Sequence, residues 1–240
     1  MSDIEFDGTG GWAADFVKGG ETELTPLRIE KRRVGAAVRR VIESVASVDA
    51  SFEVMHEAAA KLEAVAALLE DEPAAQWVGF AEAANAPRFD SFLDRSPVLG
   101  QANPIAPPVE LTIEDQVVYG HVTFGSAYEG PPGSVHGGWI AAAFDEVLGA
   151  TQSLSGSGGM TAFLKVDYRS PTPLHQPLRF EGELERTEGR KIFTVGRLFH
   201  GDTLCAEAHA LFISIDFSVF AEMQRQRPVP PTIPPSLPPT

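Results

Sequence analysis

The residues most suited to chemistry lie on one apolar segment. His136 to Thr151 reads His-Gly-Gly-Trp-Ile-Ala-Ala-Ala-Phe-Asp-Glu-Val-Leu-Gly-Ala-Thr, which is apolar on nearly every side when drawn as a helix. A helix of this composition is normally buried. Asp145 shares a helix face with small and apolar neighbours, where desolvation disfavours an ionised group unless a partner compensates. A carboxylate in this position is suited to act as a general base.

The start of the same helix is suited to hold an electrophile. Gly137 and Gly138 have no side chains, so a ligand can approach backbone N–H groups at the positive end of the helix dipole. Such donors can stabilise a carbonyl oxygen that becomes an oxyanion. His136 and Asp145 are nine residues apart, which is about 13 Å along a helix. One subunit cannot easily bring both groups together, so we expect a homodimer, or a dimer of dimers, with a shared site.

The segments on either side of this helix have the pattern of β-strands. Two short runs precede it, at 109–113 and 117–124, and four follow it, at 161–169, 178–186, 191–200 and 203–216. Glu188-Gly189 and Gly201-Asp202 fit hairpin turns between the later strands. This order predicts an α+β fold in which an antiparallel sheet wraps around one central helix.

The loop before the helix carries a more specific signal. The run Tyr-Glu-Gly-Pro-Pro-Gly-Ser-Val-His-Gly-Gly at 128–138, followed by Asp145, resembles the hotdog-fold thioesterases of the PaaI type, including the THEM4-like acyl-CoA thioesterases. The resemblance covers residues 103–217 and implies the hotdog fold. It also implies hydrolysis of an acyl-CoA, or of a related acyl thioester, to a free acid and a thiol. It implies no cofactor apart from the CoA of the substrate.

The resemblance also implies roles for individual residues. The N–H of Gly137 polarises the thioester carbonyl, and Asp145 of the neighbouring subunit activates water or attacks the carbonyl carbon. Thr161, at the start of the next strand, helps to position the water. His136 supports the geometry of the loop, and we group it with Gly138 as a substrate-binding residue.

Two positions leave these assignments open. Many members of the family carry Asn or Gln six residues before the histidine to hold the water, whereas this chain has Gly130 there. Glu129 is adjacent but in the wrong register. Glu146 directly follows Asp145, and only the spacing in the family selects between the two carboxylates.

Two other classes of function remain as alternatives. A hotdog hydratase or dehydratase would use a histidine, here His136, to move a proton at the acyl α or β carbon. A non-catalytic module would bind acyl-CoA without hydrolysing it, and the glycine at position 130 keeps this alternative open.

Composition excludes several other classes of protein. The 33 acidic and 19 basic residues give a formal net charge of -14, which repels nucleic acids. Every apolar run is shorter than the ~18 residues of a membrane span. His121, His175, His200 and His209 lack the spacing of metal ligands, so we expect no metal. The single cysteine, Cys205, and the Met-Ser-Asp-Ile-Glu start predict a cytoplasmic protein.

The rest of the chain divides by composition. Residues 1–27 are glycine-rich and predict a flexible N-terminal arm, residues 73–102 form a proline-containing connector, and residues 218–240 form a proline-rich tail. Between arm and connector, residues 28–72 carry apolar residues at alternating steps of four and three, which is typical of helices. We expect a helix hairpin with this apolar stripe buried, with one continuous coiled-coil helix as the alternative. We interpret the basic residues between 28 and 40 as a solvated helix face, or as a face that docks on acidic surface elsewhere.

Overall fold

The computed structural model describes residues 25–72 and 94–215. Nearly all of the expected N-terminal arm, most of the proline-containing connector and the proline-rich tail lie outside the described residues. The remaining part of the connector, 94–102, packs against the sheet domain, and its Val98 and Leu99 belong to the hydrophobic core.

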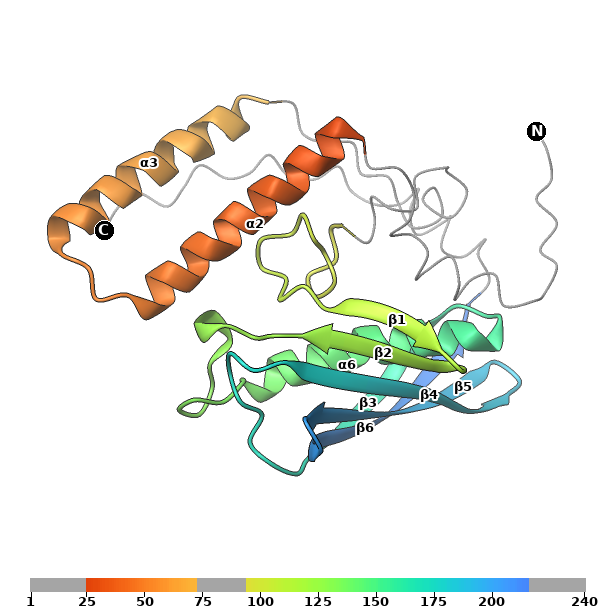
Figure 1. Cartoon of the computed structure of the whole chain (residues 1–240). Helices are drawn as coiled ribbons and strands as arrows, with labels where there is room; N and C mark the ends of the chain where they lie inside the picture. The colour runs from red at the N-terminus through yellow and green to blue at the C-terminus, as the bar shows by residue number, and fades with distance from the viewer. Residues whose placement is uncertain (1–24, 73–93, 216–240) are drawn as a thin grey trace, which may run out of the picture.

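An antiparallel sheet and one central helix form the main body (Figure 1). The strands are β1 (Glu110–Glu114), β2 (Val117–Val122), β3 (Gly159–Tyr168), β4 (Leu178–Glu188), β5 (Lys191–His200) and β6 (Thr203–Ser214). They lie in the order β1-β2-β4-β5-β6-β3, and every neighbouring pair is antiparallel. The helix α6 (Gly137–Gln152) crosses one face of the sheet. Along the chain it follows the short helix η1 (Ser126–Tyr128) and precedes the short helix η2 (Ser153–Ser155). The predicted α+β hotdog fold is confirmed.

Glycines in the sheet allow α6 to lie close to it. Gly182 of β4 and Gly196 of β5 are partners in the ladder. A Cβ atom at Gly196 would lie 3.1 Å from both Leu148 and Phe144 of α6. Phe144 then packs edge-on against Phe180, with ring centroids 4.9 Å apart. The central helix and the sheet therefore share one close-packed core.

Strand β3 lies at one edge of the sheet, because among the described strands it pairs only with β6. The residues at 160–163 are exposed on both faces of this strand. Met160 and Phe163 keep 48% and 49% of their surface exposed. Apolar side chains at an unpaired strand edge are typical of a surface that another chain covers.

The expected helical region forms two helices, α2 (Pro26–Ser47) and α3 (Phe52–Glu70). The side chain of Thr25 accepts a hydrogen bond from the Arg28 N–H and caps α2, and Pro26 occupies the first turn. Ser51 caps α3 in the same way by accepting from the Val54 N–H. Neither helix is long and apolar enough to cross a membrane, and the same holds for the other helices in the described ranges.

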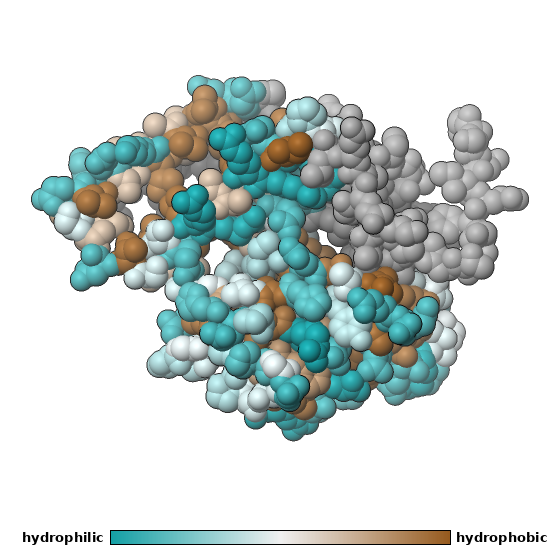
Figure 2. All heavy atoms as spheres, in the orientation of Figure 1, coloured by the Kyte–Doolittle hydropathy of each residue, from teal (hydrophilic) through white to brown (hydrophobic). Residues whose placement is uncertain are grey.

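Much of the apolar stripe of the two helices is left exposed by the described residues, so its burial stays a prediction. Figure 2 shows hydrophobic residues spread over the visible surface of α2 and α3. Phe52 keeps 77% of its surface exposed, Leu27 65% and Leu69 55%. α2 and α3 run beside each other in Figure 1 without packing along their lengths.

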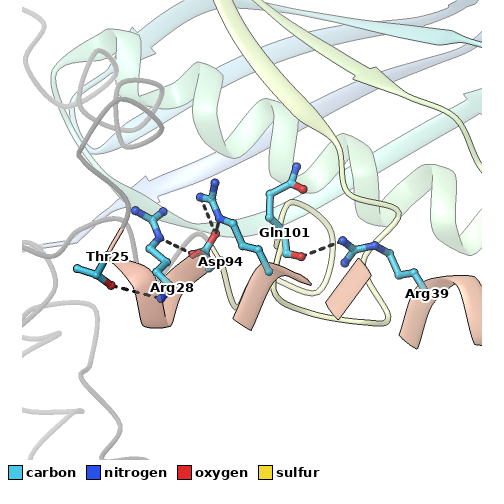
Figure 3. A network of polar contacts seen from close by, with 6 residues as sticks. Thr25, Arg28, Arg39, Asp94 and Gln101 are labelled. Carbon is cyan, nitrogen blue, oxygen red and sulfur yellow. Dashed lines mark hydrogen bonds and ion pairs between the residues drawn. The ribbon is translucent and has the colours of Figure 1, made fainter. Parts of the chain in front are cut away.

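Instead, α2 attaches to the main body through polar groups (Figure 3). Arg28 and Arg32 both form ion pairs with the carboxylate of Asp94. Arg39 donates to the backbone oxygens of Gln101 and Asn103, at 2.9 and 2.8 Å. Part of the basic run is therefore not solvated, because Arg28, Arg32 and Arg39 hold the helix on residues 94–103.

Candidate active site

The side chain of His136 caps the first turn of α6. Its Nδ1 atom accepts a hydrogen bond from the Gly138 N–H at 3.0 Å. The prediction that both glycines present free donors is therefore wrong for Gly138. No acceptor among the described residues pairs with the Gly137 N–H, which leaves this group to receive a ligand at the positive end of the helix.

Tyr168, which the sequence analysis did not select, closes the other side of the helix start. Its hydroxyl donates to the backbone oxygen of Gly137 at 2.8 Å. A Cβ atom at Gly137 would lie 3.0 Å from the same hydroxyl oxygen, so the glycine allows this contact. The last residue of β3 thereby fixes the position of the first residue of α6.

The two residues predicted to act on water lie together. Thr161 of β3 donates its hydroxyl hydrogen to Oδ1 of Asp145 at 2.8 Å. Asp145 is half-buried and Thr161 is exposed, so the pair opens toward the surface at the edge of the sheet. The hydrogen bond holds one carboxylate oxygen and leaves Oδ2 to face a substrate or water.

A β-bulge makes this pair possible. The register of β3 against β6 shifts between Thr161 and Phe163, so Ala162 is the extra residue. Thr161 lies opposite Phe212 and Tyr168 lies opposite Ala206, and both of these β6 residues are buried. Thr161 and Tyr168 are seven residues apart and would face opposite sides of a regular strand. The bulge brings both onto the face that meets α6.

Glu146 points away from this pair and contacts the segment before β1. Its Oε1 atom accepts a hydrogen bond from the Ser96 hydroxyl at 2.9 Å. Burial raises the pKa of the Glu146 carboxyl, the Ser96 hydrogen bond opposes this shift, and the negative charge of Asp145 adds to it. The structure therefore places only Asp145 at the edge strand, while Glu146 lies in the contact with residues 94–99.

The loop before α6 explains the glycine at position 130. A Cβ atom there would lie 2.7 Å from Cα of His136, so no larger residue fits this conformation. Glu129 closes the loop, because its Oε1 atom accepts from the Gly133 N–H at 2.6 Å. Gly133 has a φ of +72°, which favours glycine. Glu129 thus has a place in the loop that the sequence analysis did not assign.

The structure does not bring all five predicted site residues to one point within the chain. Asp145 and Thr161 form one group, and Gly137, Gly138 and His136 form another. Gly137 and Asp145 are eight residues apart on α6, which corresponds to about 12 Å of helix. In the described part of the chain, no three His, Cys, Asp or Glu side chains gather as metal ligands. Within one chain the two groups therefore lie apart.

Comparison with known proteins gives the family. A family model for the thioesterase superfamily matches residues 132–208, which include the start of α6, Asp145 and Thr161. The crystal structure of a thioesterase superfamily protein is 36% identical, with a TM-score of 0.67, and the match covers 76% of this chain and 94% of that one. The chain belongs to the thioesterase superfamily. The match is longer than the sheet domain and so extends into the rest of the chain.

Among curated proteins, the chain is similar to acyl-coenzyme A thioesterase THEM4. The Xenopus laevis protein is 43% identical over 93 residues, which are 38% of this chain and 42% of that protein. The Mus musculus protein is 41% identical over 90 residues, which are 37% of this chain and 39% of that protein. The match thus spans less than half the length of these curated relatives.

Proposed function

We propose that this protein is a thioester hydrolase that converts an acyl-CoA, or a related acyl thioester, to the free acid and the thiol. The observation that carries the proposal is the hydrogen-bonded pair of Asp145 and Thr161 at an open sheet edge. The unpaired Gly137 N–H supplies the matching electrophile site. The similarity to proteins named acyl-coenzyme A thioesterase supports acyl-CoA as the substrate class.

The proposed active unit is a homodimer joined at β3. The edge of this strand is unpaired, and Met160, Phe163 and Tyr168 expose about half of their surfaces there, at 48%, 49% and 54%. Two such edges can pair around a two-fold axis and continue the sheet. This arrangement would place α6 of one subunit beside α6 of the other. Asp145 of the partner subunit then faces the Gly137 N–H.

In the proposed reaction the thioester carbonyl oxygen accepts a hydrogen bond from the Gly137 N–H. Asp145 of the partner subunit takes a proton from water while the water oxygen bonds to the carbonyl carbon. Negative charge moves to the carbonyl oxygen, where the N–H and the helix dipole stabilise it. The intermediate then collapses, the C–S bond breaks with its electron pair on sulfur, and the proton from Asp145 passes to the thiolate.

The hydrogen bond from Thr161 serves to orient the carboxylate. Because Oδ1 is held at 2.8 Å, Oδ2 keeps one direction toward the water. The same geometry allows Oδ2 to attack the carbonyl carbon and expel the thiolate, which would give a mixed anhydride that water then hydrolyses at the Asp145 carbonyl. Single turnover in ¹⁸O-labelled water separates the two routes, because only the anhydride route leaves label in the Asp145 carboxylate.

The proposal extends to the setting of the reaction. Acyl thioesters are intermediates of fatty acid metabolism, and a hydrolase of this kind would release free acids from them. The lone Cys205 is buried in β6, which fits a protein of a reducing compartment such as the cytoplasm.

The test measures thiol release by the purified full-length chain from acyl-CoAs that range from acetyl to palmitoyl and include one aromatic acyl group. Enoyl hydration is followed in parallel, since it would indicate the hydratase alternative. Asp145→Asn should lower kcat by ~100-fold or more with little change in KM, because the helix start still holds the carbonyl.

The neighbouring substitution Glu146→Gln is the matched comparison, and its effect on kcat should be small because Glu146 contacts Ser96 rather than β3. A steep loss for Glu146→Gln and none for Asp145→Asn would refute the assignment of the base. Tight acyl-CoA binding without thiol release or hydration would indicate the binding module instead.

A further inference from the structure

The polar face of α2 determines where the rest of the helix points. Arg28, Arg32, Gly35, Arg39 and Glu43 recur at steps of four and three and so share one face. Every one of them contacts the main body, and a Cβ atom at Gly35 would lie 2.8 Å from a backbone oxygen of residue 102. Because this face docks, the opposite side of α2 is directed away from the sheet.

The side of α2 that does not dock carries an apolar heptad seam. Its members are Leu27, Val34, Val38, Val41 and Val45, followed by Val48 directly after the helix, and all of them fall on a or d positions of heptads. Val45 and Val48 keep 55% and 54% of their surface exposed. An a position of the same seam is Lys31, which is also exposed.

α3 carries a second seam of the same kind. Its members are Phe52, Met55, Ala59, Leu62, Ala66 and Leu69, again at alternating steps of three and four. Apart from Ala58, every residue of α3 is exposed. A heptad seam normally packs against another helix, because the side chains at its a and d positions insert between the side chains of that helix.

The charges on the two helices are complementary. α2 carries six arginines and lysines and two glutamates, whereas α3 carries four glutamates and one lysine. On α2, Lys31 and Arg40 are exposed and make no ion pair with any described residue. On α3, Glu53 and Glu63 are exposed and likewise make no ion pair within the described ranges. A basic helix and an acidic helix attract each other, whereas two helices of the same charge repel each other.

We infer that a second copy of this chain covers both seams, with α2 of each copy packed against α3 of the other in a four-helix bundle. This contact is isologous, which means that both copies use the same surface. A single two-fold axis relates the copies and covers both seams of each. Figure 1 shows α2 and α3 on the side of β1, and β3 lies at the opposite edge of the sheet. The bundle is therefore a separate contact from the proposed β3 dimer, and the two together make a dimer of dimers.

The test compares the solution mass of the full-length chain, by light scattering on a sizing column, with that of a seam variant. Val45→Glu combined with Leu62→Lys places a charge in each seam. The matched control, Ser44→Glu with Ala60→Lys, adds the same charges at exposed positions beside the seams. We expect the wild type and the control to have twice the mass of the seam variant. Equal masses would overturn the inference.

Charge reversal provides a second measurement that does not depend on the apolar substitutions. Lys31→Glu with Arg40→Glu should halve the mass, because α2 then presents acidic residues to the acidic α3 of the other copy. Adding Glu53→Lys and Glu63→Lys in the same chain should restore the wild-type mass. If neither set changes the mass, or if seam variants lower only the melting temperature, the seams are covered by the same chain and the inference fails.

Two outcomes separate this inference from the proposed function. The seam variant should keep its thioesterase activity per chain, because β3 and Asp145 lie at the other edge of the sheet. Asp145→Asn should in turn keep the full mass. The inference would be overturned if the wild type floats with phosphatidylcholine vesicles and has the same mass as the seam variant. That result would assign the seams to a lipid surface.

Discussion

The hydroxyl of Thr161 donates to Oδ1 of Asp145 at 2.8 Å, which joins the edge strand β3 to the middle of α6. At the other end of the same strand, the hydroxyl of Tyr168 donates to the first residue of α6. β3 therefore holds both chemically important points of the helix.

Replacing Thr161 tests the orientation of the carboxylate. Thr161→Val keeps the shape of the side chain and removes the donor to Asp145, so kcat should fall about tenfold, or ~1.4 kcal/mol in the barrier. KM should change little, because the Gly137 N–H still holds the carbonyl. Thr161→Ser keeps the hydroxyl and should retain most of the rate. A wild-type rate for Thr161→Val would show that the hydrogen bond has no part in catalysis.

Much of this arrangement follows from the sequence. The alternation of polar and apolar residues and the turns at Gly189 and Gly201 were sufficient to predict the last three strands, and both glycines have positive φ as such turns require. The apolar segment after His136 predicted the central helix. These features are local, and local pattern decides where elements begin and end.

The features that sequence could not give depend on contacts between distant residues. The bulge at Ala162 changes which face Thr161 occupies, and a strict two-residue alternation does not contain it. The ion pair of Arg28 with Asp94 joins residues 66 positions apart, so the basic run alone could not identify its partner. The capping bond from Gly138 to His136 is local, and the preference of polar side chains for the residue before a helix could have predicted it.

The N–H of Gly137 can be removed without breaking the helix. Gly137 is the first helical residue of α6, where proline is well tolerated, and His136 before it has the extended φ of -61° and ψ of 131° that precede proline. Gly137→Pro should lower kcat/KM by ~100-fold, the scale for loss of an oxyanion donor.

Gly137→Ala is the matched control for this change. Both substitutions add a Cβ atom close to the Tyr168 hydroxyl, and only proline removes the N–H. Circular dichroism and the melting temperature should show that both variants fold. Equal losses for alanine and proline would attribute the effect to crowding at Tyr168 and would contradict a role for the N–H.

Glu146 should make stability depend on pH. Because burial raises the pKa of this carboxyl in the folded state, folding favours its protonated form. The resulting stabilisation is complete below the ordinary glutamate value of about 4.3 and is lost as pH rises through the higher folded value. The melting temperature of the wild type relative to Glu146→Gln should therefore fall as pH rises from acid to neutral.

The same scan on Glu114→Gln, at an exposed position of β1, supplies the comparison for this measurement. A difference between wild type and Glu146→Gln that is constant with pH would show that the carboxyl is not desolvated in solution. The amide oxygen introduced by Glu146→Gln can still accept a hydrogen bond from Ser96, so loss of that contact does not complicate the comparison.

The strongest test of the shared site uses mixed dimers. The two chains are co-expressed with different tags in the Val45→Glu/Leu62→Lys background, so that the helical seams add no further copies. A pair of Asp145→Asn and Gly137→Pro chains has one site with both groups intact and one site with neither. If the site is shared, such a pair should recover about half of the wild-type rate, although each parent is nearly inactive.

The reciprocal pair gives the opposite expectation. A wild-type chain paired with an Asp145→Asn/Gly137→Pro chain has one defect in each shared site, so it should be nearly inactive. If Gly137 and Asp145 instead act within one chain, this pair keeps about half of the wild-type rate and the first pair stays inactive. A shared site makes the first pair active and the second inactive, and a site within one chain does the reverse. Measuring the rate of both pairs therefore decides which subunit provides the carboxylate.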